Sequence, residues 1–225
     1  MILTDISLYG IILSKPAKAG ERLNQNRDSY NKICGEWRRV RGEMPPNKCI
    51  VDFADTLAQG ARILDVGCGC GRPIAGYLAG QGFNVVGIDI SESMIKAARS
   101  EHIAGCEFIV SDFLDYDSDT KFDAVIAFDS LWHIPHENQR AIYPRLAKLL
   151  KIGGRLLFTH GKRDGSVEGE MFGARFYYSA LDAQEAVALL ERNGFGQIEY
   201  ELDYVEPTTG DRELIVTAEL VRRVD

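Results

Sequence analysis

A glycine-rich segment in the first half of the chain constrains the fold more than any other feature. Residues 63–72 read ILDVGCGCGR, a buried-strand pattern that runs directly into a loop with glycines at 67, 69 and 71. Glycine lets such a loop turn tightly and lets its backbone approach a bound ligand closely. Asp89 ends the next apolar run, where a carboxylate accepts hydrogen bonds from both hydroxyls of a ribose. This order of strand, loop, helix, strand and acid predicts a site for a nucleoside-containing cofactor.

Short apolar runs alternate with helical patterns from residue 61 onward. Five runs read as buried strands: ARILDV, NVVGIDI, CEFIV, FDAVIAF and RLLFTH. Strands that alternate with helices form a parallel sheet covered on both faces. Near the end of the chain, QIEYELDYV and ELIVTAELV are separated only by the turn-like EPTTGDR, which predicts a hairpin. We therefore predict an α/β fold, a Rossmann-like, doubly wound and mostly parallel sheet with an antiparallel C-terminal edge hairpin.

Further helices are expected on either side of and within this alternating core. A polar stretch over residues 24–41 predicts one helix, and Pro46 begins a second. The segment PHENQRAIYPRLAKLL predicts one long helix closed by Gly153 and Gly154, and residues 181–193 predict the last helix.

Composition excludes several classes of protein. The chain has 225 residues, with 26 Lys and Arg against 33 Asp and Glu, a formal net charge of −7. This acidic balance argues against nucleic acid or an anionic membrane surface as the main partner. The opening MILTDISLYGIIL lacks the pattern of a signal peptide and is shorter than the about 20 apolar residues that span a membrane. Five cysteines, an odd number scattered along the chain, predict a reducing cytoplasm.

The cysteine pair in the glycine loop does not predict a metal site. Cys68 and Cys70 form C-x-C, but no second Cys or His pair with ligand spacing accompanies them, and structural zinc takes four ligands. We interpret both residues as small side chains that fill the loop, and we expect no metal.

The spacing of the loop distinguishes between cofactors. A dinucleotide site runs G-x-G-x-x-G, whereas residues 65–71 run D-x-G-x-G-x-G. This spacing resembles the first motif of class I S-adenosylmethionine-dependent methyltransferases. GIDIS, SDF at 111–113, FDAVIAFDSLWHI and LLKIGGRLLFT resemble later motifs of that family, in the same order, so the resemblance covers roughly Ala61 to Val221. It implies the class I methyltransferase fold, S-adenosylmethionine as cofactor and S-adenosylhomocysteine as product.

The resemblance also implies a division of the chain and a cofactor site. Residues 1–60 are then an N-terminal helical cap segment, and residues 61–225 the methyltransferase domain with a lid-like insertion at 161–179, in a single domain overall. Asp65 and the loop backbone would face the methionine end of the cofactor, Asp89 the ribose and Asp112 the adenine. The full set of implied cofactor residues is Asp65, Gly67, Cys68, Gly69, Asp89, Ile90, Asp112, Phe113 and Phe128.

The sequence indicates the residues around the methyl acceptor less specifically than those around the cofactor. His133 follows the fourth strand, where this family approaches the transferable methyl, and an imidazole suits a general base. A structural imidazole packed beside Trp132 is the alternative. The carboxyl ends of the parallel strands meet at one edge of the sheet. We therefore expect His133 to line one cavity with Tyr177 and Tyr178. The remaining candidate substrate contacts are Tyr30, Trp37, Trp132 and His160.

The function expected from the resemblance is transfer of a methyl group to oxygen or nitrogen of a small molecule, without a metal. GEMFGARF at 169–176 resembles a segment of bacterial small-molecule methyltransferases of largely unassigned substrate. The alternatives are methylation of protein or RNA, and a non-catalytic module that binds S-adenosylmethionine. A nicotinamide dehydrogenase is a further alternative, which the loop spacing disfavours.

Overall fold

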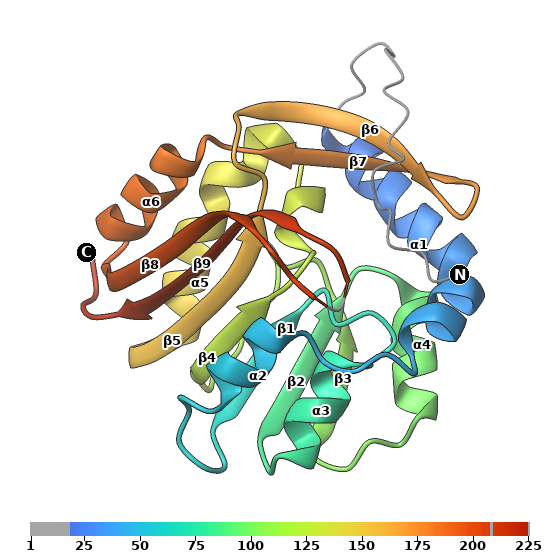
Figure 1. The fold of residues 1–225 in the computed structure, drawn as a ribbon, viewed down its shortest axis with the longest axis horizontal. Coiled ribbons are helices and arrows are strands. Elements are labelled where there is room, and N and C mark those ends of the chain that lie inside the picture. Colours follow the sequence, from blue (N-terminus) through green and yellow to red (C-terminus); the bar gives the residue numbers. More distant parts are fainter. Residues whose placement is uncertain (1–18, 208, 225) are drawn as a thin grey trace.

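A computed structural model describes residues 19–207 and 209–224, and the apolar opening segment of the sequence lies outside the described residues. Seven strands form one sheet in the order β3-β2-β1-β4-β5-β9-β8 (Figure 1). Strands β1 to β5 pair in parallel, and β9 pairs antiparallel with both β5 and β8. The strands are β1 (Arg62–Val66), β2 (Asn84–Asp89), β3 (Cys106–Val110), β4 (Phe122–Ala127), β5 (Leu150–His160), β8 (Phe195–Tyr204) and β9 (Arg212–Leu220). The predicted sheet and its C-terminal hairpin are confirmed.

Helices cover both faces of this sheet because alternate strand residues are apolar toward each face. On one face, α5 (Ile142–Leu149) and α6 (Ala183–Arg192) bury Leu146 and Leu190 against Leu64 and Val125. On the other, α2 (Lys48–Ala54) and α3 (Ile74–Gly80) bury Ile50 among a second set of strand residues. Helix α4 (Glu92–Ser100) joins this second layer.

The N-terminal helix and a second, smaller sheet lie beyond the carboxyl ends of the parallel strands (Figure 1). Helix α1 (Ala19–Arg41) packs against β7 (Ala174–Ala180), which pairs antiparallel with β6 (Gly165–Met171). The insertion predicted at 161–179 is thus mostly a hairpin rather than an irregular loop. Helices α1 and α2 do not form one cap, because α2 belongs to the core of the sheet.

One predicted helix is wrong in its bounds. The segment before α5 forms a separate 3₁₀ helix, η2 (His136–Ala141), and α5 begins only at Ile142. Pro144 explains the break, because its ring has no N–H and clashes with the carbonyl four residues earlier in a continuous α-helix. The predicted closing pair, Gly153 and Gly154, lies inside β5, where the register against β4 shifts.

Candidate functional site

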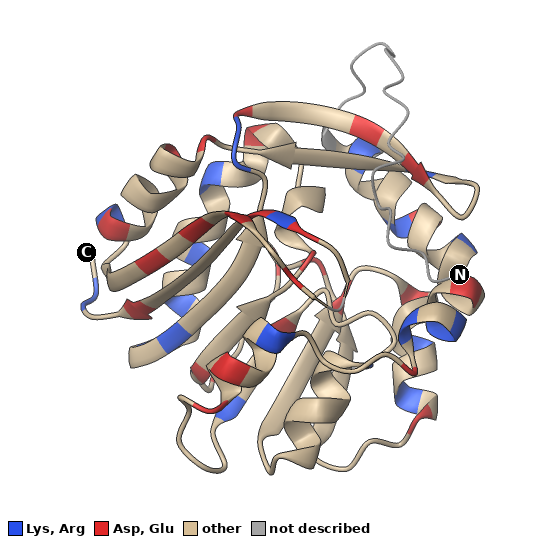
Figure 2. Cartoon of the chain, in the orientation of Figure 1, with Lys and Arg blue, Asp and Glu red and all other residues tan. Residues whose placement is uncertain are grey.

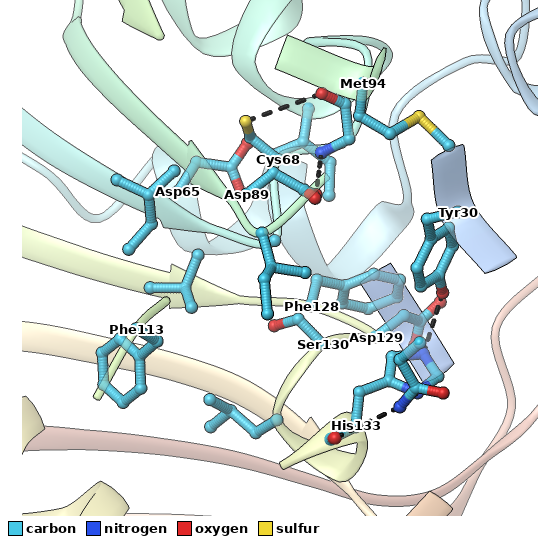
Figure 3. Close-up of a pocket in the computed structure, with 18 of the residues that line it drawn as sticks. Tyr30, Asp65, Cys68, Asp89, Met94, Phe113, Phe128, Asp129, Ser130 and His133 are labelled. Atoms are coloured by element: carbon cyan, nitrogen blue, oxygen red, sulfur yellow. Dashed lines mark hydrogen bonds between the residues drawn. The ribbon is translucent and has the colours of Figure 1, made fainter. Parts of the chain in front are cut away.

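A pocket of about 120 Å³ lies where β1, β2 and β4 end, beneath α1 (Figure 3). Its floor comes from the glycine loop and from the residues that follow β2 and β4. Its cover comes from α1, which contributes Leu23, Asn26, Tyr30, Trp37 and Arg41. Segments that are far apart in the sequence therefore meet at the carboxyl ends of the parallel strands, the edge of the sheet where a ligand site is expected.

The glycine loop is shaped by close contacts that exclude side chains. Gly67 has a φ of +75°, and a Cβ atom there would lie 2.4 Å from the Cβ atom of Ser130. The amides of Gly67 and Cys68 both donate to the carbonyl of Ile88, at 2.8 and 3.0 Å. These bonds fasten the loop to the end of β2, with Gly67, Cys68 and Gly69 in the pocket wall.

Asp89 sits at the end of β2 with its carboxylate held in place. One oxygen accepts from the amide of Gly69 at 2.9 Å and the other from the amide of Ser91 at 2.8 Å. Burial raises the pKa of Asp89 to about 6, although these two amides counteract the shift. Because each carboxylate oxygen accepts more than one bond, the group retains acceptor capacity toward the pocket.

Asp65 is the pocket carboxylate with a buried oxygen that lacks a hydrogen-bond partner. Its side chain is 2% exposed, and its Oδ2 atom has no hydrogen-bond partner. Burial, with a smaller contribution from the charge of Asp89, raises the pKa of Asp65 to about 7. An unsatisfied buried carboxylate oxygen costs about 1–3 kcal/mol or more, so a cationic ligand group beside it would be strongly favoured.

The far end of the pocket is built by Ile90, Ser111, Asp112 and Phe113. The amide of Leu114 donates to Asp112 at 2.9 Å, while burial raises the pKa of that carboxyl. All nine cofactor residues expected from the sequence line this pocket, Phe128 included.

His133 lies in η1 (Leu131–His133), just after β4, and lines the pocket with both ring nitrogens engaged. Its Nδ1 atom lies 3.0 Å from the carbonyl oxygen of Tyr177, an acceptor, so Nδ1 carries the proton. Its Nε2 atom therefore accepts from the Tyr30 hydroxyl at 2.8 Å (Figure 3). It also accepts from Trp132 Nε1 at 3.3 Å. Burial lowers the pKa of His133 to about 4, so the ring is neutral near pH 7.

The other expected acceptor residues divide into two groups. Tyr30 and Trp37 line the pocket from α1. Trp132, Tyr177 and Tyr178 do not line it but surround His133, and the Tyr178 ring centroid lies 4.9 Å from that of the imidazole. The structure thus does not place Tyr177 and Tyr178 in one cavity with His133, because the Tyr177 hydroxyl lies against Arg22 of α1 and the amide of His136, and the Tyr178 ring packs against Trp132 and His133.

His160 is also outside the pocket. The side chain is fully buried, with Nε2 2.8 Å from Gln139 Oε1 and Nδ1 3.0 Å from the carbonyl of Gly161. Burial lowers the pKa of His160 to about 4. The expectation that the end of β5 supplies a substrate contact fails at this residue, because the side chain points toward η2 instead.

Sequence reasoning missed several polar residues of the site. Asn26 is buried and bonds both the amide and the carbonyl of Tyr177, at 2.8 and 2.9 Å. Asp129 has a φ of +56° and a bidentate pair with Arg212 from β9, both bonds at 2.6 Å. Arg41 ends α1 in the pocket wall. Only its spacing of four residues from Trp37 marks Arg41 in the sequence, as a neighbour on the same helix face.

Comparisons of sequence show similarity to methyltransferases. Residues 63–154 match a family model described as a methyltransferase domain. The chain is 31% identical over 179 residues to phosphoethanolamine N-methyltransferase 3 of Arabidopsis thaliana, covering 75% of this chain and 35% of that protein. It is 32% identical over 143 residues to a ubiquinone biosynthesis O-methyltransferase of Alkalilimnicola ehrlichii, covering 58% and 56%. The chain therefore spans between about a third and just over half of these curated relatives.

Comparisons of structure extend over nearly the whole chain. The 1,6-didemethyltoxoflavin-N1-methyltransferase of Burkholderia thailandensis has a TM-score of 0.70 at 20% identity, with 95% of both chains covered. The magnesium protoporphyrin IX methyltransferase of Synechocystis PCC 6803 has a TM-score of 0.66 at 23% identity, with 88% of this chain and 99% of that one covered. Both neighbours are structures with bound S-adenosylhomocysteine.

The sheet order, the antiparallel hairpin and the glycine loop at the strand ends define the class I methyltransferase fold. Within that fold, residues 63–154 are similar to a methyltransferase domain. Among the described residues, no helix is both long and apolar enough to cross a membrane.

Proposed function

We propose that this protein transfers the methyl group of S-adenosylmethionine to oxygen or nitrogen of a small molecule. The observation that carries the proposal is the row of carboxylates along one pocket, Asp65, Asp89 and Asp112. Their spacing along the strand ends suits the three polar parts of one nucleoside-containing cofactor. The unpartnered Oδ2 atom of Asp65 fits a cationic amino group, and the fixed carboxylate of Asp89 fits two ribose hydroxyls.

The chain's own residues would orient the cofactor and keep water out. S-adenosylmethionine, when bound, supplies an electrophilic methyl carbon on a sulfonium. Cys68 and Gly69 would contact its methionine end, while Ile90 and Phe113 would pack around its adenine. Helix α1 covers the same space, so Tyr30 and Trp37 would exclude water from the transfer.

His133 and Tyr30 are the proposed acceptor-side pair. Tyr30 lines the pocket, and its hydroxyl donates to the neutral imidazole, so a proton leaving an acceptor O–H or N–H could pass through this hydroxyl to His133. His133 would then hold Tyr30 in place and take up the proton through it. Trp132, Tyr177 and Tyr178 support this pair from outside the pocket, and no role in substrate contact is proposed for His160.

Three features support a small molecule as the acceptor. The pocket has a volume of about 120 Å³ and is partly covered by α1, whereas a polymer substrate needs an open approach. Acidic side chains lie along β8 and β9 (Figure 2), and the net charge of −7 disfavours nucleic acid as the substrate. The sequence relatives named above carry small-molecule substrates in their names.

All five cysteines are free thiols, which supports a cytoplasmic location.

Thermal shift and calorimetry with S-adenosylhomocysteine test the cofactor part of the proposal. We expect a rise in Tm and measurable binding with S-adenosylhomocysteine, and neither with NAD, because the loop lacks the dinucleotide spacing. Binding followed by methyl release to members of a hydroxyl and amine acceptor panel tests the transfer. Binding of NAD alone would overturn the cofactor assignment, and binding without transfer to any acceptor would favour the non-catalytic module.

A further inference from the structure

One side chain, Asn31, fastens the middle of α1 to the first turn of α4. Its Oδ1 atom accepts from the amide of Ser93 at 3.0 Å and from the hydroxyl of Ser91 at 2.7 Å. Its Nδ2 atom donates to the carboxylate of Glu92 at 3.0 Å. A backbone amide only donates, so the contact with Ser93 identifies the side-chain oxygen of Asn31. Asn31 therefore engages three consecutive residues at the start of α4.

Helix α4 does not depend on Asn31 for its own N-cap. The Ser91 side chain accepts from the amide of Met94 at 3.1 Å, which is the bond that an N-cap serine supplies. The bonds from Asn31 are additional, and they join two helices rather than complete one. Three residues further along α1, Cys34 donates to the carbonyl of Ser93 at 3.4 Å, so the contact continues on the same face of α1.

The same turn of α4 holds the carboxylate at the end of β2. The amide of Ser91 donates to Asp89 Oδ1 at 2.8 Å, and Ser91 is fully buried. The other oxygen of Asp89 accepts from Gly69 in the glycine loop at 2.9 Å. A chain of hydrogen bonds thus runs from Asn31 through Ser91 to Asp89. Whatever fixes Ser91 therefore also fixes the amide that orients this carboxylate.

Asn31 lies outside the pocket, but both of the residues that it influences line it. Neither Asn31 nor Ser91 belongs to the pocket wall, whereas Asp89 and Tyr30 do. Tyr30 precedes Asn31 in α1, so the bonds of Asn31 also set the position of Tyr30. The Tyr30 hydroxyl in turn bonds His133 at 2.8 Å. Asn31 thus stands between the carboxylate at the end of β2 and the acceptor-side pair.

We propose that Asn31 is a positioning residue that couples the docking of α1 to the binding of a ribose at Asp89. The inference rests on the proposed function, and it names a residue that acts on the cofactor without touching it. A ribose held by Asp89 stabilises Ser91 and the first turn of α4, and Asn31 then holds α1 and Tyr30 over the site. The coupling is reciprocal, because docking of α1 raises the affinity for the ribose by the same factor.

A double-mutant cycle tests whether Asn31 acts through Asp89. Calorimetry would measure the affinity for S-adenosylhomocysteine of the wild type, Asn31→Ala, Asp89→Asn and the double variant. We expect Asn31→Ala alone to lose about three- to tenfold, because two hydrogen bonds behind Asp89 are lost. In the Asp89→Asn background the same change should lose less than about twofold, because the group through which it acts is already altered. Asn24→Ala is the matched control, since Asn24 is exposed on the same helix.

Asn31→Asp separates positioning from folding. The aspartate keeps the oxygen that accepts from Ser91 and Ser93, so its affinity for S-adenosylhomocysteine should stay within about twofold of the wild type. Equal losses for Asn31→Ala and Asn31→Asp, or equal losses from Asn31→Ala in both Asp89 backgrounds, would make Asn31 a structural residue and overturn the proposal. Unchanged affinity of Asn31→Ala would overturn it as well.

Hydrogen exchange with adenosine measures the coupling from the other side. Adenosine carries the ribose and the base but lacks the amino-acid chain, so it reports on the Asp89 end of the pocket. We expect adenosine to slow amide exchange over residues 26–34 in the wild type but not in Asn31→Ala. Equal protection of this segment in both proteins, or none in an adenosine-bound wild type, would contradict the coupling while leaving the proposed function intact. If the wild type binds neither adenosine nor S-adenosylhomocysteine, the proposed function itself fails.

Discussion

Asp89 and Asp65 lie on neighbouring strands, but their environments differ. Asp89 accepts two backbone amides, whereas Asp65 has an oxygen with no partner at all. The first carboxylate is therefore positioned before any ligand arrives, and the second is left to be satisfied by one. Both are predictable from the sequence as acids at the carboxyl ends of buried strands, Asp65 within β1 and Asp89 as the last residue of β2, but the difference between them depends on tertiary packing.

Removing the Asp89 carboxylate should abolish tight cofactor binding without unfolding the protein. Hydrogen bonds to charged groups contribute about 1.5–3 kcal/mol each, so Asp89→Ala should lose at least about tenfold in affinity for S-adenosylhomocysteine. Calorimetry measures this loss, with Asp117→Ala as the control because Asp117 is an exposed acid paired with Lys148. Unchanged affinity of Asp89→Ala would remove this residue from the site.

Cofactor affinity should fall as the pH falls from about 8 to 5.5. Burial raises the pKa of Asp65 to about 7 and that of Asp89 to about 6, so both carboxyls become protonated over this range. Protonated carboxyls lose their charge-assisted bonds to an amino group or to ribose hydroxyls. Titration calorimetry at several pH values measures the slope, and Asp65→Asn should flatten its upper part, near pH 7.

The same pKa shift has the opposite effect on the apo protein. A carboxyl whose pKa is raised on folding contributes stability that is complete below its unfolded pKa and is lost as pH rises through the folded value. Asp65→Asn should therefore gain stability relative to the wild type between about pH 4 and 7, by up to about 1.4 kcal/mol per unit of raised pKa. A variant that weakens both binding and apo stability at pH 8 would contradict this account.

Substitutions at the acceptor-side pair separate a base from a structural imidazole. His133→Ala should leave the affinity for S-adenosylhomocysteine unchanged and lower methyl transfer by about 10²- to 10⁴-fold once an acceptor is known. Tyr30→Phe should lower transfer as well, because it removes the hydroxyl that donates to His133 Nε2 and would relay the proton. If His133 is structural, Tyr30→Phe will keep full turnover, and His133→Ala will mainly lower the Tm.

At the scale of elements, α1 and the β6–β7 hairpin are joined as one cover. The buried amide of Asn26 donates to the carbonyl of Tyr177 and accepts from its amide, and Ser29 donates to the carbonyl of Arg175. The same Tyr177 carbonyl accepts a hydrogen bond from the Nδ1–H group of His133. The cover thus orients the imidazole, which links the position of α1 to the chemistry of the pocket.

Asn26→Ala should loosen this cover. The substitution removes the side-chain acceptor of the buried Tyr177 amide and leaves the Tyr177 carbonyl with His133 as its side-chain partner, at a cost of about 1–3 kcal/mol. Urea denaturation measures the loss of stability, and hydrogen exchange should accelerate along β7. Asn24→Ala is the control, because Asn24 is exposed on the same helix, and its stability should change by less than about 0.5 kcal/mol. Equal stability of both variants would contradict the role of Asn26.

Elements with strong local signals were predictable, and those decided by distant partners were not. The parallel strands carry continuous apolar runs, and the C-terminal hairpin carries a turn signal between two alternating strands. The β6–β7 hairpin lacks such a signal, because glycines at 165, 169 and 173 and two glutamates obscure the alternation. Its strands form against α1, a contact between segments about 150 residues apart.

At the scale of the whole molecule, the sequence predicts the cofactor half of the pocket better than the acceptor half. The cofactor residues sit on one contiguous set of strand ends, so strand order alone brings them together. The acceptor half is lined by residues of α1 and η1 and is supported from outside by β7 and by Arg212 of β9, and no local pattern records which side chains meet. Asp129 illustrates the difference, since its bidentate partner lies 83 residues away.

We expect the molecule to need no metal ion for cofactor binding or methyl transfer. The acid best placed to hold a divalent ion beside the transferable methyl is Asp129, but both of its oxygens are engaged by Arg212. An ion would have to displace a buried guanidinium, which makes further hydrogen bonds to the carbonyls of Thr209 and Gly210. Elsewhere in the described part of the chain, no group of three or more acids, histidines and cysteines is arranged as a metal site.

Chelation tests this expectation on the intact protein. Dialysis against EDTA should leave both the affinity for S-adenosylhomocysteine and the rate of methyl transfer unchanged, because Arg212 already neutralises the carboxylate that an ion would use. Addition of magnesium or manganese should then have no effect beyond that of matched ionic strength, for which sodium chloride is the control. A loss of transfer on chelation that magnesium restores would show that Asp129 exchanges Arg212 for the ion during turnover. In that case Arg212→Lys, which weakens the bidentate pair, would be expected to raise the affinity for magnesium rather than to lower it.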